Sequence, residues 1–273
     1  MFMSSPLAAT TVRATKTFRP LSAARICSTL IAMSETPLCF RSATELAALI
    51  RDRQLSSVDL VKAYLAQIEK WNPRLNAVVS LRAEAALREA AAADRAVRAG
   101  EKIGPLHGLP ITLKDGVRVR GVRSTFGGLP MYWNHHPQTA CTLVDRLRKA
   151  GAIVLGRTNL PLMALDWQCS SPFLGEGQNP WDLERTSGGS SGGAAAALAA
   201  GFTALELGSD LGGSIRYPAH CCGVLGLRTS DGLFPLDDFG PEDEKAPFGR
   251  LLSFGPMART LPDLSLMLEV LTD

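Results

Sequence analysis

Polar caps and apolar stripes alternate in the N-terminal third of the chain and predict three helices. Ser42 precedes the amphipathic pattern LAALIRDRQL, and Glu45 follows it at the spacing of a capping box. Ser57 opens a second amphipathic segment, VDLVKAYLAQIEKW, which we expect to end at Pro73. The third segment, RAEAALREAAAADRAVRAG, carries an alanine stripe on one side and charges on the other, and Gly100 is expected to end it.

Short apolar runs of strand length are interspersed with further helical patterns. The strand-like runs are NAVVSL, LPITLK, AIVLGRT and FTALELGSD, and the later helical patterns are TLVDRLRKAG and AAAALAAG. Because this alternation is typical of a sheet covered by helices on both faces, we predict an α/β fold. The charged, proline-containing stretch LDDFGPEDEKAPFGR predicts a long surface loop, and LPDLSLMLEVLTD predicts a last amphipathic helix.

The first 34 residues have a different composition from the rest of the chain. They carry arginine and lysine among serine, threonine and alanine, and no acidic residue occurs before Glu35. This composition is typical of an organellar transit peptide. The alternative is that translation begins at Met33 and the upstream stretch has no fold. We therefore predict a targeting or disordered extension over residues 1–34 and one domain over residues 35–273.

Composition restricts the class of partner. The chain has 273 residues, 46% of them hydrophobic, and its 29 basic and 26 acidic residues give a formal net charge of +3. Without a dense basic block, a nucleic-acid partner is not expected, and a small molecule fits better. No apolar run reaches the roughly 18 residues of a membrane span. The six cysteines show no C-x-x-C spacing, so neither zinc nor a disulfide framework is indicated, and we expect a reducing, cytoplasmic location, with an organelle as the alternative.

Two glycine-flanked serine loops suggest one shared site. GGSSGG surrounds Ser190 and runs into an alanine helix from about residue 194, and LGSDLGGSIR carries Ser214 after a strand near residues 202–207. Clustered glycines indicate a tight bend or a close approach of the main chain to another group. A serine between a strand and a helix holds its hydroxyl at the sheet edge, where free N–H groups of Leu211, Gly212 and Gly213 can bind a developing oxyanion.

A serine nucleophile needs a base, and lysine is the better candidate here. None of the four histidines has an obvious carboxylate partner in the sequence. Lys114 ends the apolar run LPITLK, so a strand would bring its amine to the same sheet edge as the serine loops. Lysine acts as a base only when neutral, so burial must lower its pKa from about 10.4.

These segments resemble the amidase signature family of serine hydrolases. GGSSGGAAAALAAG followed by LGSDLGGSIRYPAHCCGVLGLR resembles the family's core, and GPLHGLPITLKDGV resembles its lysine-bearing strand. The motifs run in order from about Pro105 to Arg228, and weaker similarity extends from about Ser42 to the C-terminus. The resemblance implies a mixed twisted sheet with helices on both faces.

The resemblance also implies a role for each motif residue. Ser214 is the expected nucleophile, Ser190 is the middle serine on a cis peptide bond, and Lys114 is the base that activates Ser214 through Ser190. The other expected roles are an oxyanion hole from the amides of Leu211, Gly212 and Gly213, supporting hydrogen bonds from Ser191 and Ser209, and a bracing pair of Asp210 with Arg216. Neither a cofactor nor a metal is implied.

We predict an amidase that hydrolyses a small carboxylic amide through an acyl-enzyme on Ser214. The alternatives are the A-like component of a glutamyl-tRNA amidotransferase and a non-catalytic member of the family. Leu162 stands where many members carry an acidic residue, which favours the general amidases. The stretch GLRTSDG replaces a commoner lysine-proline version, and Asp166, Trp167 and Gln168 are candidates for the acyl pocket.

Two unrelated enzyme classes match single motifs only. An α/β-hydrolase shares G-x-S-x-G with GGSSG, but NPWDLERT before it is loop-like and the last histidine is His220. A phosphate-binding loop would need Lys-Ser/Thr after its glycines. Family members usually continue well past the length of this chain, so we expect the C-terminal part of the fold to be missing. An unpaired sheet edge would then favour aggregation or a homo-oligomer and reduce activity.

Overall fold

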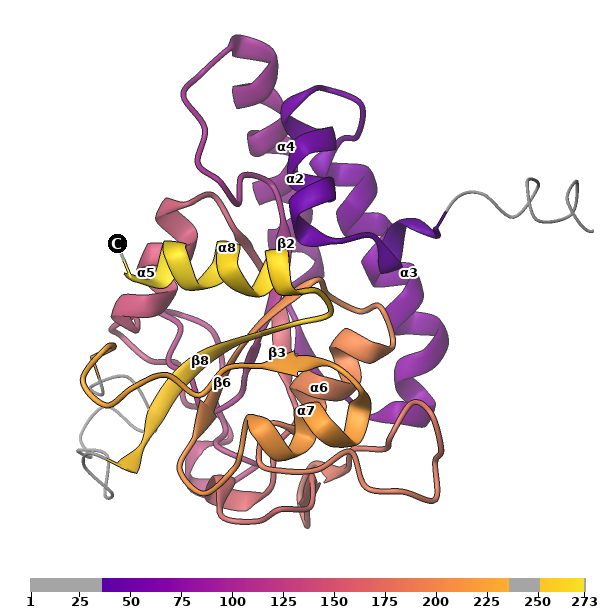
Figure 1. The fold of residues 1–273 in the computed structure, drawn as a ribbon, viewed down its shortest axis with the longest axis vertical. Coiled ribbons are helices and arrows are strands. Elements are labelled where there is room, and N and C mark those ends of the chain that lie inside the picture. Colours follow the sequence, from indigo (N-terminus) through magenta and orange to yellow (C-terminus); the bar gives the residue numbers. More distant parts are fainter. Residues whose placement is uncertain (1–35, 236–250, 273) are drawn as a thin grey trace, which may run out of the picture. The chain divides into compact units, whose positions relative to one another are not determined.

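A six-stranded mixed sheet forms the centre of the computed structural model, which describes residues 36–235 and 251–272 (Figure 1). Its strand order is β1-β3-β2-β6-β8-β7. Strand β2 pairs in parallel with β3 and β6, and the other three pairings are antiparallel. The six strands are β1 (Val78–Leu81), β2 (Pro110–Lys114), β3 (Ile153–Thr158), β6 (Leu205–Asp210), β7 (Leu225–Gly226) and β8 (Ser253–Ala258). The predicted α/β class is confirmed.

Seven α-helices are present in the described residues, and several pack on the sheet. They are α2 (Ala43–Arg51), α3 (Ser57–Leu75), α4 (Ala83–Ala99), α5 (Thr142–Lys149), α6 (Gly192–Ala199), α7 (Arg216–Cys222) and α8 (Leu261–Thr272). Helix α6 packs on β2, β3 and β6, while α8 packs on β6 and β8. The strands β2, β3, β6 and β8 are buried along their whole length. Short 3-10 turns, η1 (Leu38–Phe40), η2 (Pro130–Tyr132) and η3 (Leu162–Ala164), and a small hairpin of β4 (Ser170–Ser171) and β5 (Gly175–Glu176) complete the elements.

The predicted helix boundaries hold where a local cap determines them. Ser42 Oγ accepts a hydrogen bond of 3.1 Å from the Glu45 amide and so begins α2. Gly100 ends α4 in a left-handed conformation with φ of 73°, which glycine adopts without steric cost.

Helix α3 differs from the prediction at both ends. Its N-cap is Ser56, not Ser57, and Ser56 Oγ accepts a 3.0 Å hydrogen bond from the Asp59 amide. Pro73 does not end the helix, which continues to Leu75. Proline is tolerated there because it lies in the exposed last turn, where water can satisfy the carbonyl that loses its N–H partner.

The C-terminal part of the sheet was the least predictable. Strand β6 begins at Leu205 rather than near Phe202, and β8 was not predicted at all. The loop expected over residues 236–250 and the extension expected over residues 1–34 lie outside the described residues. Residues Pro37–Asp273 form one structural unit, and all statements below concern its described part.

Candidate active site

Lys114 ends β2 with its whole side chain buried. Its Nζ donates hydrogen bonds to Ser190 Oγ at 2.7 Å and to Ser209 Oγ at 3.0 Å. Burial lowers the pKa of Lys114 to about 7, because the ammonium loses its hydration, although nearby ionisable groups oppose the shift. The predicted lysine and two of the predicted serines therefore meet at the end of the sheet.

Glycines bring the Ser190 loop into contact with its surroundings. The Gly189–Ser190 peptide bond is cis. A methyl group in place of a hydrogen would lie 2.4 Å from the Asn159 nitrogen at Gly193 and 2.5 Å from the Asp166 oxygen at Gly189. These contacts agree with the close main-chain approach that the glycines predict. Helix α6 follows directly, and its small side chains let it pack against the sheet.

Ser214 lies between β6 and α7, beside the Ser190 loop. The Ser191 amide donates to the Ser214 carbonyl at 3.0 Å, and Ser191 Oγ donates to the Ser209 carbonyl at 3.4 Å. The Ser214 residue is 7% exposed, so its hydroxyl has little contact with solvent. Within the described part of the chain, no hydrogen bond joins Ser190 Oγ to Ser214 Oγ.

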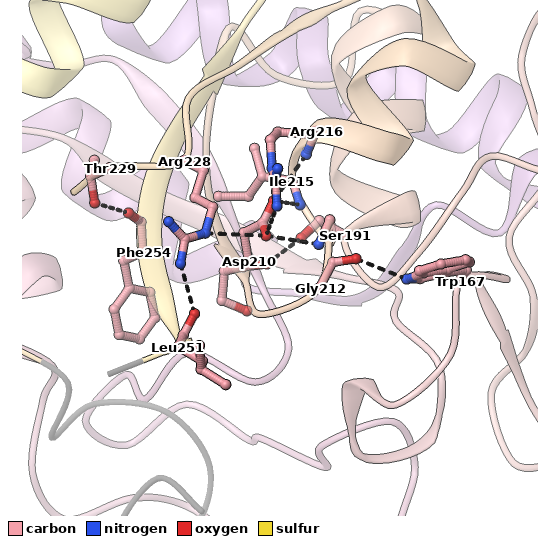
Figure 2. Close-up of polar contacts among 12 residues, drawn as sticks. Trp167, Ser191, Asp210, Gly212, Ile215, Arg216, Arg228, Thr229, Leu251 and Phe254 are labelled. Atoms are coloured by element: carbon pink, nitrogen blue, oxygen red, sulfur yellow. Dashed lines mark hydrogen bonds and ion pairs between the residues drawn. The ribbon is translucent and has the colours of Figure 1, made fainter. Parts of the chain in front are cut away.

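Asp210 organises the loop that carries Ser214 (Figure 2). Its carboxylate accepts from Arg216 Nε and Nη2 at 3.0 Å each, from the Gly213 amide at 2.8 Å and from the Ile215 amide at 3.0 Å. Arg228 Nε lies 3.6 Å from the same carboxylate. Burial raises the pKa of Asp210, but the hydrogen bonds from Arg216 and the amides outweigh it and lower the value to about 2. The carboxylate therefore remains ionised at all ordinary pH values.

The three amides expected to form an oxyanion hole are not equivalent. The Gly213 N–H is already bonded to Asp210. In residues 36–235 and 251–272, no protein group accepts from the N–H of Leu211 or Gly212. A methyl group at Gly212 would meet no atom within 4 Å, so the space beside this amide is open. Leu211 and Gly212 are thus the predicted donors that remain available.

Trp167 contacts the same loop from the segment before β4. Its Nε1 donates to the Gly212 carbonyl at 3.1 Å (Figure 2), and its ring centroid lies 6.1 Å from that of Tyr217. The residue is 62% exposed. Asp166 and Gln168, its neighbours in sequence, are also exposed, and their backbone atoms lie beside Gly189. An acyl pocket at these residues stays a prediction.

Two residues near the site were not recognised from the sequence. Arg228 connects Asp210 to the start of β8, because its Nη2 donates to the Leu251 carbonyl at 2.9 Å. Glu206, a buried acid in the middle of β6, gave no signal because it occurs inside an apolar strand run. Among the described residues, no cluster of histidine, cysteine or acidic side chains could hold a metal ion. No helix in that part of the chain is long and apolar enough to cross a membrane.

Known proteins resemble the chain in sequence and in fold. The Amidase family model matches residues 59–273. An indoleacetamide hydrolase of Bradyrhizobium diazoefficiens is 41% identical over 232 residues, which are 85% of this chain and 44% of that protein. An acylamidase of Rhodococcus erythropolis is 40% identical over 242 residues, 88% of this chain and 49% of that protein.

The similarity extends to solved structures. A bacterial aryl acylamidase of the amidase signature family superposes with a TM-score of 0.79 at 33% identity, over 86% of this chain and 48% of that one. The chain spans about half the length of the curated relatives it matches.

Proposed function

The chain belongs to the amidase signature family, and from this premise we propose that it hydrolyses a carboxylic amide to an acid and ammonia or an amine. The observation that carries the proposal is the contact of 2.7 Å between Lys114 Nζ and Ser190 Oγ in a fully buried setting. A lysine with an ordinary pKa is neutral in fewer than roughly one molecule in a thousand at pH 7. With a pKa of about 7, half of the Lys114 side chains are free amines at neutral pH.

In the proposed acylation, Ser214 Oγ forms a bond to the carbonyl carbon of the amide. Its proton passes to Ser190 Oγ, while the proton of Ser190 passes to the amine of Lys114. The carbonyl π electrons move onto oxygen, and the oxyanion accepts hydrogen bonds from the amides of Leu211 and Gly212. These two amides support the assignment because they have no protein acceptor in the described residues.

Collapse of the tetrahedral intermediate breaks the C–N bond. The leaving nitrogen takes back the proton that Lys114 holds, again through Ser190, and departs as ammonia or an amine. Water then attacks the acyl carbon by the same proton path, which releases the acid and restores the Ser214 hydroxyl. Water and amide are consumed, and acid and amine are produced, without a further reactant.

Formation of the relay needs the Ser190 and Ser214 hydroxyls to approach each other. The hydrogen bond from the Ser191 amide to the Ser214 carbonyl already joins the two loops. Catalytic hydrogen bonds that are absent in a free enzyme often form only with substrate bound. We therefore assign the final contact of the relay to the substrate complex.

Release of ammonia or amine from a panel of aliphatic, aryl and peptide amides, with free glutamine included, tests this function. We expect turnover of at least one amide and its loss in Ser214→Ala. Ser230→Ala is the matched control, because Ser230 is an exposed serine after β7. Turnover that persists in Ser214→Ala would contradict the proposal, and so would a folded protein that turns over none of these amides.

A further inference from the structure

Glu206 places a buried carboxyl in the middle of the sheet. It is fully buried, and its Oε1 accepts a hydrogen bond of 2.6 Å from Thr158 Oγ1. Its Oε2 has no hydrogen-bond partner in the described residues. Burial raises the pKa of Glu206 to about 8, although the Thr158 hydroxyl and Arg157 partly oppose the shift. Such an acid keeps its proton at neutral pH.

The strand register puts this carboxyl on the same face of the sheet as Lys114. Thr112 in β2 pairs with Glu206 in β6, and Lys114 pairs with Thr158 in β3. Paired residues on neighbouring strands point to the same face, and so do residues two apart on one strand. Thr158 is therefore level with Lys114 and donates to Glu206. The acid and the base are one residue pair apart on adjacent strands.

The other charges near this pair are already engaged. Asp210 accepts from Arg216 and two amides, as described above. Arg157, which acts on Glu206, has its Nε 3.6 Å from Asp115 Oδ1.

The remaining neighbours of the pair carry no charge. Burial raises the pKa of Cys169 to about 11, so its thiol stays neutral beside Lys114. Helix α6 contributes only glycine, alanine and leucine, and Met257 pairs with Glu206 from β8. Glu206 is thus the carboxyl that can exchange its charge with Lys114.

We propose that Glu206 is a positioning residue for the base: Glu206 and Lys114 titrate as one coupled pair, and Glu206 sets the pH range in which Lys114 is a free amine. This inference rests on the proposed function, in which Lys114 is the base. Neither group has to touch the substrate for the effect.

Proton counting gives the consequence. The fully protonated pair, ammonium with carboxylic acid, loses one proton to give either ammonium with carboxylate or amine with carboxylic acid. Only the second form is a base, so this first step activates part of the enzyme. Loss of the second proton gives amine with carboxylate and activates the rest. Two interacting groups therefore spread the rise in activity over two macroscopic steps.

The pH dependence of kcat/KM in Glu206→Gln tests the pairing. Glutamine keeps the shape and can still accept from Thr158, but it cannot stabilise the ammonium as a carboxylate does. We expect the alkaline limb to become a single-proton step and to move to lower pH by about one unit. Thr158→Val keeps the carboxyl but removes its donor, so it should shift the limb in the same direction by less.

Asp94→Asn is the matched control. Asp94 is also a buried acid, but it accepts from the Ser57 amide and lies in α4. Its replacement should leave the limb where it is. A limb in folded Glu206→Gln and Thr158→Val that coincides with that of the unmodified protein would overturn the pairing.

An NMR titration of the Lys114 side chain, assigned by its loss in Lys114→Met, separates this inference from the proposed function. A titration that moves to lower pH in Glu206→Gln supports the pairing even if no amide is hydrolysed. Hydrolysis with an unmoved Lys114 titration would contradict the pairing while leaving the function intact.

Discussion

Lys114 Nζ lies 2.7 Å from Ser190 Oγ, and both residues are buried. The contact joins the end of β2 to the loop before α6, two segments that are 76 residues apart in the chain. A buried ammonium that keeps only hydroxyl and carbonyl partners is poorly stabilised, which is why its pKa falls to about 7. The predictions below follow from this placement.

Replacement of Lys114 should remove both catalysis and its pH dependence. With Lys114 as base, kcat/KM rises with pH through about 7 as the amine loses its proton. Lys114→Met retains the length of the side chain but has no base, so we expect a loss of about 10²–10⁴-fold and no alkaline limb. Initial rates between pH 5 and 10 measure both effects. An unchanged limb in the variant would assign it to another group.

The same lysine should make the free energy of unfolding depend on pH. Its folded pKa lies below the unfolded value, so the unfolded chain binds more protons between pH 7 and 10.5. The penalty of the buried ammonium is full below pH 7 and is relieved as pH rises, at up to about 1.4 kcal/mol per pH unit. Denaturant unfolding of Lys114→Met should therefore show its largest gain in stability over the unmodified chain near pH 7. A constant difference between pH 7 and 10 would contradict the lowered pKa.

Two glycine substitutions should separate stability from activity. Gly193→Ala places a methyl group 2.4 Å from the Asn159 nitrogen, and we expect a loss of stability of about 2 kcal/mol or more. Gly212→Ala meets no atom within 4 Å, so its unfolding free energy should change by less than about 1 kcal/mol. Because the added methyl group occupies the space proposed for the substrate carbonyl, kcat/KM should still fall. Full activity in Gly212→Ala would place the oxyanion elsewhere.

Asp210 should be necessary for the shape of the nucleophile loop. Asp210→Asn removes the charge that Arg216 and the Gly213 amide bind, and we expect a loss of about 2 kcal/mol or more in stability at pH 7. The folded pKa of about 2 is below the unfolded value, so this contribution is present above about pH 4 and is lost as pH falls toward 2. Chemical denaturation at pH 7 and pH 3 measures it.

The exposed pair of Asp182 with Arg185 provides the control for this prediction. Surface ion pairs of this kind contribute less than about 1 kcal/mol. Asp182→Asn should therefore leave stability nearly unchanged. Equal effects in the two variants would show that Asp210 has no special role in the loop.

The sequence predicts those features that depend on a few neighbouring residues. Ser42 and Gly100 cap their helices by local geometry, and β2 is a continuous apolar run ending in Lys114. Strand β8 was missed because Gly255 and Pro256 interrupt its pattern. Its stability comes from pairing with β6, a tertiary contact that no local pattern contains.

The candidate site was predictable to a similar degree. The family motifs indicated which residues to examine, but not that the Gly213 amide is bound to Asp210. The relation between Glu206 and Lys114 was invisible in the sequence, because it depends on the register of β2 with β3 and β6.

Covalent trapping with a fluorophosphonate probe, followed by peptide mapping, tests the central claim most directly. The probe mimics the tetrahedral intermediate and labels a serine only when that serine is activated. We predict an adduct on Ser214 of the unmodified chain, no adduct in Ser214→Ala, and much slower labelling in Ser190→Ala and Lys114→Met. An adduct on another residue, or undiminished labelling of Ser214 without Lys114, would contradict the account.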